Sequence, residues 1–398
     1  MSAAVLHCYA DHKWTGPSEP VAVLCRELRR RNWRIALACR GLRSGSERSL
    51  ADEARRMGVQ VEDRFHFDSG AGVRRGMEEV LGLSRLIEEG NFDLVHVHGS
   101  WDHTLAGTAL RRGPRRFRLV RSDHGGRLYK GTPHERLQFG PRGTDHLIVL
   151  SDRLRARALI RLGQPPDAVT MVRGAIDLEE YQPRTAPPHM RASLGLGEKD
   201  VVFAVVARVQ RHRRFPALLA AAKFVQRADA RVKIVVLGRG TRKATLLDRP
   251  VVERGLERTV LPLGYRREDY HEVLAACDAG LMLVPGSDGS CRAAMQMAAM
   301  EKPLVVARRG VLPDIVCDGE TGIVTPDTPE ELAKALLEMA SLSAEVRRAW
   351  GRAARERMAG CFSLCRHVDD VVAVYEKVLA GPVRRIQAGQ TSSTGERY

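Results

Sequence analysis

Short runs of apolar residues recur along the chain, separated by polar or glycine-containing loops and by longer segments with helical periodicity. Uninterrupted apolar runs are typical of strands that are buried on both faces of a parallel sheet. The pattern predicts strands at residues 5–8, 35–39, 59–61, 93–99, 117–122, 146–150, 201–207, 233–237, 260–263, 281–284 and 304–307. Helices are predicted at residues 21–31, 73–89, 153–162, 293–300, 329–339, 344–358 and 368–379. This alternation of strands and helices predicts an α/β protein.

The segment from Ala279 to Pro326 shows the order strand, loop, helix, strand most clearly. Its loop contains Asp288, Gly289 and Ser290, directly ahead of a helix rich in alanine and methionine. In an open α/β sheet such a loop lies at the carboxyl edge of the strands, where ligands bind. The amino terminus of the following helix directs free amides and a partial positive charge at that edge, which favours an anionic ligand.

This segment resembles the retaining glycosyltransferases of family 4, which have the GT-B fold. That family has a glutamate, seven further residues and a second glutamate, followed by a Gly-x-Pro. Here the same spacing holds Asp288 and Gln296, and Glu301 stands where the glycine is usual. Residues 310–322 are similar to the family's Gly-Gly-x-Pro-Glu-x-Val and Asp-Gly-x-Thr-Gly sequences. Residues 169–177 resemble the family's sequence at the crossing between its domains.

The resemblance implies a GT-B architecture of two Rossmann-like, doubly wound parallel-sheet domains that face each other across a cleft. Residues 1–176 would form the acceptor-side domain and residues 177–364 the nucleotide-sugar-binding domain. Residues 365–382 would cross back onto the first domain, as the family's final helix does. Residues 383–398 contain few apolar side chains and are predicted to form a disordered tail.

Two cations in the second domain match the family's diphosphate site. Arg208 ends the predicted strand 201–207, and Arg213 stands five residues later, where the family keeps a lysine. Two fixed cations would neutralise the charge that grows on the leaving phosphates, and arginine preserves the charge of lysine while adding a planar fork. A register shifted to the neighbouring Arg211 and Arg214 is the alternative.

The resemblance assigns the rest of the donor site to residues near the same edge. Asp288 would hold the sugar hydroxyls and Gln296 the ribose hydroxyls. Loop and turn residues would line the nucleotide: Gly238, Gly240, Tyr265, Gly289 and Ser290.

The first domain offers two candidates by resemblance. Gly16 lies ahead of a predicted helix, where the family's glycine-rich loop approaches the donor phosphate or the acceptor; an ordinary turn explains this glycine equally well. His124 follows the strand 117–122 and matches the family's histidine that reaches the donor sugar. A neutral imidazole there can donate or accept one hydrogen bond.

A histidine pair raises the question of a metal. His96 and His98 lie two residues apart on a predicted strand and therefore on one face of it. Such a pair can bind a metal, with His103 or His124 as a third ligand. The resembling family uses no metal for catalysis, so we expect neither a metal nor a cofactor, and a UDP- or GDP-sugar would enter as the substrate.

The charge of the chain favours an anionic partner. The formal net charge is +16, and residues 1–175 hold 30 Lys plus Arg against 20 Asp plus Glu, a surplus of +10. An anionic membrane surface fits this imbalance. Nucleic acid is a second possible partner, but the sequence contains no RRM, KH, zinc-finger or helix-turn-helix signature. A third interpretation is that the arginines are solvated and have no partner.

Length and cysteine usage place the chain among intracellular enzymes. It has 398 residues, enough for two or three domains, and its eight cysteines show no C-x-x-C pair. The apolar stretch at residues 3–8 is too short for a signal peptide, and no apolar run approaches the roughly 20 residues that cross a bilayer. We expect a cytoplasmic protein, with peripheral contact to the inner face of the membrane as a hypothesis.

The resemblance implies a retaining, metal-independent hexosyltransferase. The donor would be a nucleotide-sugar and the acceptor a glycan or a lipid-linked glycan, in the synthesis of cell-envelope polysaccharide or lipopolysaccharide. A catalytically impaired relative that only binds sugar nucleotides is the alternative, because both family glutamates are replaced.

Overall fold

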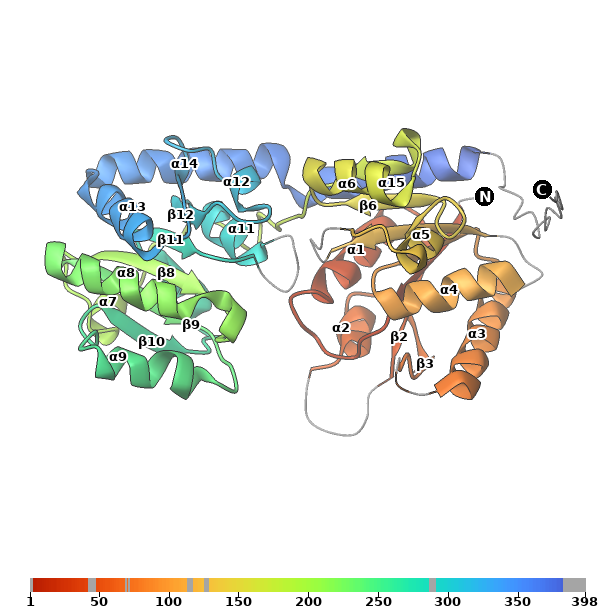
Figure 1. Ribbon diagram of the computed structural model, residues 1–398, viewed down its shortest axis with the longest axis horizontal. Helices are drawn as coiled ribbons and strands as arrows, with labels where there is room; N and C mark the ends of the chain where they lie inside the picture. The colour runs from red at the N-terminus through yellow and green to blue at the C-terminus, as the bar shows by residue number, and fades with distance from the viewer. Residues whose placement is uncertain are drawn as a thin grey trace, which may run out of the picture. The chain divides into compact units, whose positions relative to one another are not determined.

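The computed structural model describes residues 3–41, 48–68, 70, 72–112, 117–124, 129–285 and 291–381. The chain forms two compact units, each with its own parallel sheet (Figure 1). The first unit contains Met1–Asp123, Leu128–Met171 and Val368–Tyr398, and the second contains His124–Arg127 and Val172–His367. None of the helices in the described ranges is long and apolar enough to span a membrane.

The first unit is built on a seven-stranded parallel sheet in the order β3-β2-β1-β4-β5-β6-β7. The strands are β1 (Ala4–Tyr9), β2 (Arg34–Arg40), β3 (Gln60–Phe65), β4 (Leu94–Val97), β5 (Arg118–Asp123), β6 (His146–Val149) and β7 (Val169–Met171). The helices are α1 (Glu19–Arg30), α2 (Leu50–Arg56), α3 (Gly72–Glu89), α4 (Ser100–Arg112), α5 (Pro133–Phe139), α6 (Asp152–Leu162) and all but the first four residues of α15 (Leu364–Ala380).

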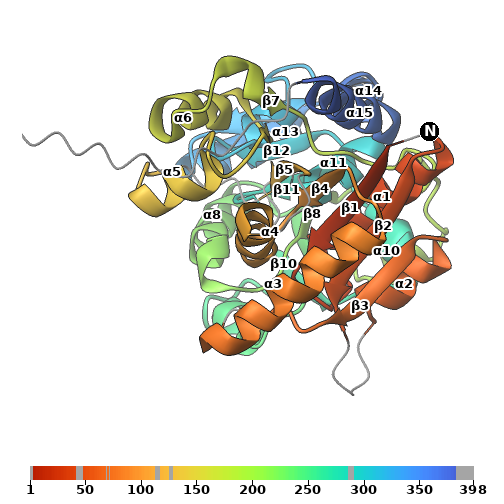
Figure 2. The same cartoon turned by 90° about the vertical axis from the view of Figure 1, so that its right-hand side faces the viewer.

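Helices α3 and α4 cover one face of this sheet, as Figures 1 and 2 show. Alternate residues of β1 and β4, such as Leu6 and Val95, enter the apolar core under these helices. The residues between them, including His7 and His96, therefore point to the opposite face, where Tyr375 of α15 meets them.

The second unit is built on a six-stranded parallel sheet in the order β10-β9-β8-β11-β12-β13. The strands are β8 (Val201–Val206), β9 (Val232–Leu237), β10 (Val260–Gly264), β11 (Ala279–Met282), β12 (Leu304–Ala307) and β13 (Gly322–Thr325). The helices are α7 (Met190–Ser193), α8 (Phe215–Ala228), α9 (Arg249–Glu253), α10 (Tyr270–Ala275), α11 (Arg292–Ala299), α12 (Leu312–Ile315), α13 (Pro329–Ser341) and α14 (Ala344–Cys361). Residues of α8 and α13 form the main apolar core with one face of the sheet.

The strands predicted from apolar runs are confirmed in both units. Ser151 caps α6, because its hydroxyl accepts a hydrogen bond from the amide of Leu154. One strand was predicted too short. β3 extends to Phe65 because it is an edge strand whose polar side chains reach solvent, so the apolar pattern covers only its start. After Gly240 a π-helical turn at Ala244–Asp248 leads into α9.

Three aspartates at the amino edges of the sheets each form a pair of hydrogen bonds to a neighbouring strand, an arrangement that we call the aspartate clamp. Asp93, Asp145 and Asp278 each stand just before a strand, and each donates its backbone N–H to a carbonyl of the neighbouring strand. The side chain of each aspartate then accepts the backbone N–H of that same neighbouring residue, at 3.0, 2.8 and 2.8 Å. The two bonds satisfy a buried strand terminus and fix the register of the strand pair.

Two non-glycine residues that flank α11 have a left-handed backbone. Glu301, which stands where the resembling family has glycine, has φ 59°, and Cys291 has φ 57°. Side chains other than glycine tolerate this region poorly, so each position carries a small strain on the order of 1 kcal/mol.

The aspartate clamp predicts a stability effect. Replacing Asp145 by Ala leaves the buried amide of Leu119 without its charged acceptor, so the free energy of unfolding should fall by about 1.5–3 kcal/mol. Asp145→Asn keeps an acceptor oxygen and should recover much of the loss. Urea titration of both variants, with the exposed Asp167→Ala as control, measures the effect; equal stability of Asp145→Ala and the control would contradict it.

Candidate functional site

The carboxyl edge of the second sheet brings most of the predicted donor-site residues to one side of the unit. β10, β9, β8 and β11 are consecutive neighbours, and the candidates follow their ends. Arg208 and Arg213 follow β8, Gly238 and Gly240 follow β9, Tyr265 follows β10, and Gln296 lies in α11 after β11.

The two candidate cations differ in their surroundings. Arg208 is exposed and has no carboxylate partner in the described part of the chain. Arg213 lies in a 3₁₀ turn, is only 7% exposed, and donates hydrogen bonds to the carbonyls of Val284 and Pro285. Arg213 therefore ties the turn after β8 to the chain that leaves β11.

The alternative pair of cations, Arg211 and Arg214, has different surroundings. Arg214 lies 3.6 Å from the carboxylate of Asp327 and donates to the Asp327 carbonyl at 2.8 Å. Its charge is thus already compensated within the unit, whereas Arg211 is exposed.

Gly238 and Gly240 are explained by a close approach of backbones. A Cβ atom at Gly238 would lie 1.9 Å from the carbonyl oxygen of Ala207, and one at Gly240 would lie 2.2 Å from that of Val209. No side chain fits at either distance. Both glycines let the segment after β9 run against the continuation of β8, which is a packing requirement independent of any ligand.

Tyr265 offers a flat surface beside these glycines. Its side chain is 60% exposed, and the guanidinium carbon of Arg239 lies 4.9 Å from the centre of the ring. This cation–π contact holds the ring in place and adds a positive charge to the same edge.

Gln296 is held between two tyrosines. The hydroxyl of Tyr270 donates to its Oε1 at 2.7 Å, and its Nε2 donates to the hydroxyl of Tyr181 at 2.8 Å. Burial raises the pKa of Tyr270, so this phenol is a neutral donor at physiological pH. A carboxamide keeps one further donor hydrogen and one further lone pair that could meet a ligand.

The predicted loop residues Asp288, Gly289 and Ser290 lie outside the described residues. The chain on either side of them is described. Pro285 receives the hydrogen bond of Arg213, and Cys291 is buried, has a left-handed backbone and starts α11.

Of the two candidates predicted for the first domain, Gly16 lies in the first unit and His124 is grouped with the second. Gly16 is exposed in the turn that precedes α1. His124 directly follows β5 and is half-buried.

The histidine pair belongs to a buried hydrogen-bond network, which we call the histidine network: His98, His7, Tyr375, His96 and Ser122. His7 and His96 are aligned partners of β1 and β4, so their side chains lie beside each other on one face. All five residues are at most 4% exposed. The prediction that His96 and His98 share a face is confirmed, because both reach this network.

The third histidine beside the pair is His7, which the sequence did not single out. His103, suggested as a third ligand, instead bonds Thr144 at 2.9 Å. A metal at His7, His96 and His98 would have to displace bonds to Tyr375 and Ser122 that already engage both nitrogens of His96 and one nitrogen of His7. The ligand nitrogens of the three histidines lie within 4.8 Å of one another, and the rings of His96 and His98 are tilted by 33° with centres 4.2 Å apart.

A buried carboxylate shapes the turn after β4. Oδ2 of Asp102 accepts the backbone amides of His98 and Gly99, both at 2.8 Å, and a Cβ at Gly99 would lie 2.3 Å from Oδ1. Burial raises the pKa of Asp102, while the nearby Arg121 and these amides act in the opposite direction. Sequence reasoning missed this residue because its partners depend on the turn geometry.

Comparisons with known proteins agree with this fold. The family model described as Glycosyl transferases group 1 matches residues 188–357, and that described as Glycosyltransferase Family 4 matches residues 16–180. The chain is 32% identical to a D-inositol 3-phosphate glycosyltransferase of Saccharomonospora viridis over 331 residues, 76% of this chain and 74% of the relative. It is 30% identical to one of Thermobifida fusca over 296 residues, 67% of this chain and 64% of the relative.

Solved structures share the architecture. A glycosyltransferase of Rickettsia africae superposes with a TM-score of 0.80 at 14% identity, over 96% of this chain and 100% of that chain. HepE of Anabaena in complex with UDP has a TM-score of 0.75 at 17% identity, over 94% and 100%. Two parallel-sheet Rossmann-like units of this kind define a GT-B glycosyltransferase. The chain belongs to the group 1, family 4 glycosyltransferases.

The buried histidines predict acid sensitivity. Desolvation lowers the pKa of His7 from 6.5 to about 3, and burial lowers that of His103 as well. Below pH 6.5 the unfolded chain binds protons that the folded chain does not, so the free energy of unfolding should fall between pH 6.5 and about 3, by up to about 1.4 kcal/mol per pH unit for each such histidine. Above pH 6.5 this contribution is constant.

Urea unfolding from pH 7.5 to 4.5 measures this dependence. His7→Phe should flatten it, whereas the same change at the exposed His66 should not. Parallel slopes for the wild type and His7→Phe would contradict the assignment.

Proposed function

We propose that this glycosyltransferase moves a hexosyl group from a nucleotide-sugar to a hydroxyl acceptor, with retention of anomeric configuration and without a metal. The observation that carries the proposal is that two arginines follow β8. Arg208 is exposed, and Arg213 donates a hydrogen bond to the carbonyl of Pro285, shortly before Asp288 in the chain. Both stand at the carboxyl edge of one sheet, where α/β proteins bind ligands.

Arg208 and Arg213 would act on the leaving group. Charge accumulates on the diphosphate as the glycosidic bond breaks, and a fixed cation stabilises that charge more than it stabilises the ground state. Arg208 would supply this cation directly. Arg213 would also position the loop, so its replacement should affect donor binding and turnover together.

The remaining donor contacts are assigned by position. Asp288 would hold sugar hydroxyls, with Gly289 and Ser290 supplying loop amides, and Gln296 would offer its remaining donor and lone pair to the ribose. Tyr265 and the glycines Gly238 and Gly240 would border the nucleotide. Structures of the fold relative HepE contain UDP and UDP-glucose, which supports a uridine nucleotide, with a GDP-sugar as the second choice.

For the acceptor, two candidates remain. The sequence relatives are named D-inositol 3-phosphate glycosyltransferases, which favours a phosphorylated cyclitol. A glycan or lipid-linked glycan in cell-envelope synthesis is the second candidate; a Bacillus subtilis relative at 23% identity is named putative glycosyltransferase EpsD. Gly16 and His124 of the acceptor side would contact the acceptor or the sugar in either case.

Donor titrations test the site. Arg208→Ala should weaken bare nucleoside diphosphate and sugar nucleotide alike, by roughly 10- to 100-fold, because it removes a charge-assisted contact of about 1.5–3 kcal/mol. Asp288→Ala should weaken only the sugar nucleotide, because the bare diphosphate has no sugar for the carboxylate to hold.

The control is Arg348→Ala, an exposed arginine of α14. If Asp288→Ala lost the bare diphosphate as strongly as the sugar nucleotide, the carboxylate would support the loop rather than read the sugar. Tight sugar-nucleotide binding without release of nucleoside diphosphate, across inositol phosphates and glycans, would favour the impaired binding protein.

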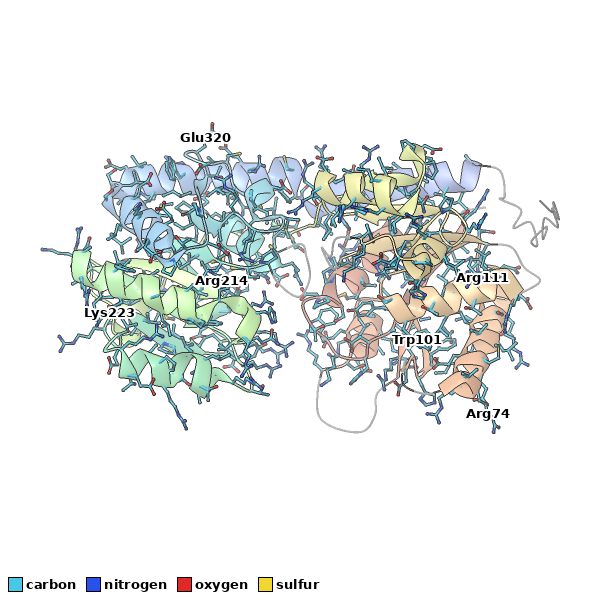
Figure 3. The ribbon with its side chains drawn as sticks, in the orientation of Figure 1. Arg74, Trp101, Arg111, Arg214, Lys223 and Glu320 are labelled. Atoms are coloured by element: carbon cyan, nitrogen blue, oxygen red, sulfur yellow. The ribbon has the colours of Figure 1, made fainter. Side chains whose placement is uncertain are left out.

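Peripheral membrane contact is a separate proposal. At the start of α3, Val73 is 88% exposed and the Arg74 side chain 95% exposed, next to the exposed Arg75 (Figure 3). Arg74→Glu with Arg75→Glu should reduce binding to anionic vesicles, and binding should fade near 0.5 M salt, where the screening length is roughly 4 Å. Arg348→Glu with Arg352→Glu is the matched control; equal loss in both pairs, or equal binding to neutral vesicles, would refute docking through α3.

A further inference from the structure

The histidine network is a continuous chain of four hydrogen bonds. His98 Nε2 lies 3.0 Å from His7 Nδ1, and His7 Nε2 lies 3.2 Å from the Tyr375 hydroxyl. The same hydroxyl lies 2.6 Å from His96 Nδ1, and His96 Nε2 lies 2.8 Å from Ser122 Oγ. Burial lowers the pKa of His7 to about 3 and raises that of Tyr375, so both of these side chains are neutral at physiological pH.

The number of protons restricts how these bonds are made. A neutral imidazole carries one N–H and one bare nitrogen, and a phenol carries one hydrogen. Because the Tyr375 hydroxyl contacts two ring nitrogens, it donates to one histidine and must accept from the other. The histidine to which Tyr375 donates therefore determines the tautomers of both His96 and His7. The tautomer of His7 in turn determines that of His98, because these two rings share a hydrogen bond.

The distances indicate which direction holds. Hydrogen bonds donated by O–H are shorter than those donated by N–H. The 2.6 Å contact is accordingly the one that Tyr375 donates, to Nδ1 of His96, and the 3.2 Å contact is the one that it accepts, from Nε2 of His7. His96 then donates its Nε2 hydrogen to Ser122, and the bare Nδ1 of His7 accepts the Nε2 hydrogen of His98.

We propose that Tyr375 holds His7, His96 and His98 in one shared Nε2–H tautomer and so acts as a positioning residue for the carboxyl edge of the first sheet. The ring of Trp33, edge-on to Tyr375 with centres 5.6 Å apart, limits the movement of the phenol. Tyr375 belongs to α15, a helix that contains residues of both units, so the network links this helix to β1, β4 and β5.

The network reaches the carboxyl edge of the first sheet. His98 directly follows β4, and its backbone amide donates to Asp102 at 2.8 Å while its Nε2 bonds His7. Both the backbone and the ring of His98 are therefore fixed where the strand ends, and this conclusion does not depend on the proposed function.

The assignment can be tested on the full chain without any ligand. Nitrogen NMR of protein labelled with ¹⁵N-histidine, at pH 7.5, should show His7, His96 and His98 each as a single Nε2–H tautomer. Tyr375→Phe removes only the hydroxyl and should turn at least His7 and His98, which it frees from the shared direction, into tautomer mixtures. Thr170→Val is the control, because it removes a hydroxyl bonded to His146 in the same sheet and should alter His146 alone.

Three results would overturn the proposal. A Nδ1–H tautomer at any of the three histidines in the wild type would reverse the assigned direction, and this measurement stands even if Tyr375→Phe fails to fold. Unchanged tautomers of His7 and His98 in folded Tyr375→Phe would show that the hydroxyl does not couple them. Zinc retained by the purified wild type and lost in His7→Phe would replace the network with a metal site.

Discussion

A parallel sheet that is covered on both faces can offer a ligand only its edges, and this constraint governs both units of the protein. The amino edges are closed by paired backbone and side-chain bonds from Asp93, Asp145 and Asp278, which satisfy strand termini that would otherwise be buried without partners. The carboxyl edges remain for function. In the second unit that edge carries Arg208, the Arg239–Tyr265 contact and the start of α11, and in the first it carries His98 and the turn held by Asp102. In both units the bonds that stabilise strand ends thus lie at the amino edge of the sheet, and the candidate functional residues lie at the carboxyl edge.

Two polar side chains at the carboxyl edge of the second sheet are held by contacts within the protein. Arg213 donates to two carbonyls of the chain after β11, and Gln296 is fixed by two tyrosine hydroxyls. If these side chains bind a ligand as proposed, such contacts would hold them in one rotamer beforehand and reduce the entropy cost of binding.

The sequence predicted what depends on local pattern. Apolar runs located the strands, and the two-residue period placed His96 and His98 on one face. Features that depend on strand order were missed. His7 and Tyr375 meet the pair because β1 lies beside β4 and α15 returns to that face. The resemblance implied the return of the final helix, but the local pattern does not show which strands are neighbours. Glu301 and Cys291 show the reverse case, since the residue type argues against a left-handed backbone that the surrounding fold still imposes.

Retaining, metal-independent transfer from a nucleotide-sugar is the central claim, and product analysis tests it most directly. The enzyme is incubated with UDP-glucose or other UDP- and GDP-sugars and with inositol phosphate or glycan acceptors, in the presence of a chelator, and the product's anomeric configuration is read by NMR. The account predicts one nucleoside diphosphate released for each product formed, with the donor's configuration preserved. An inverted product, or activity that disappears with the chelator and returns with a divalent metal, would contradict it.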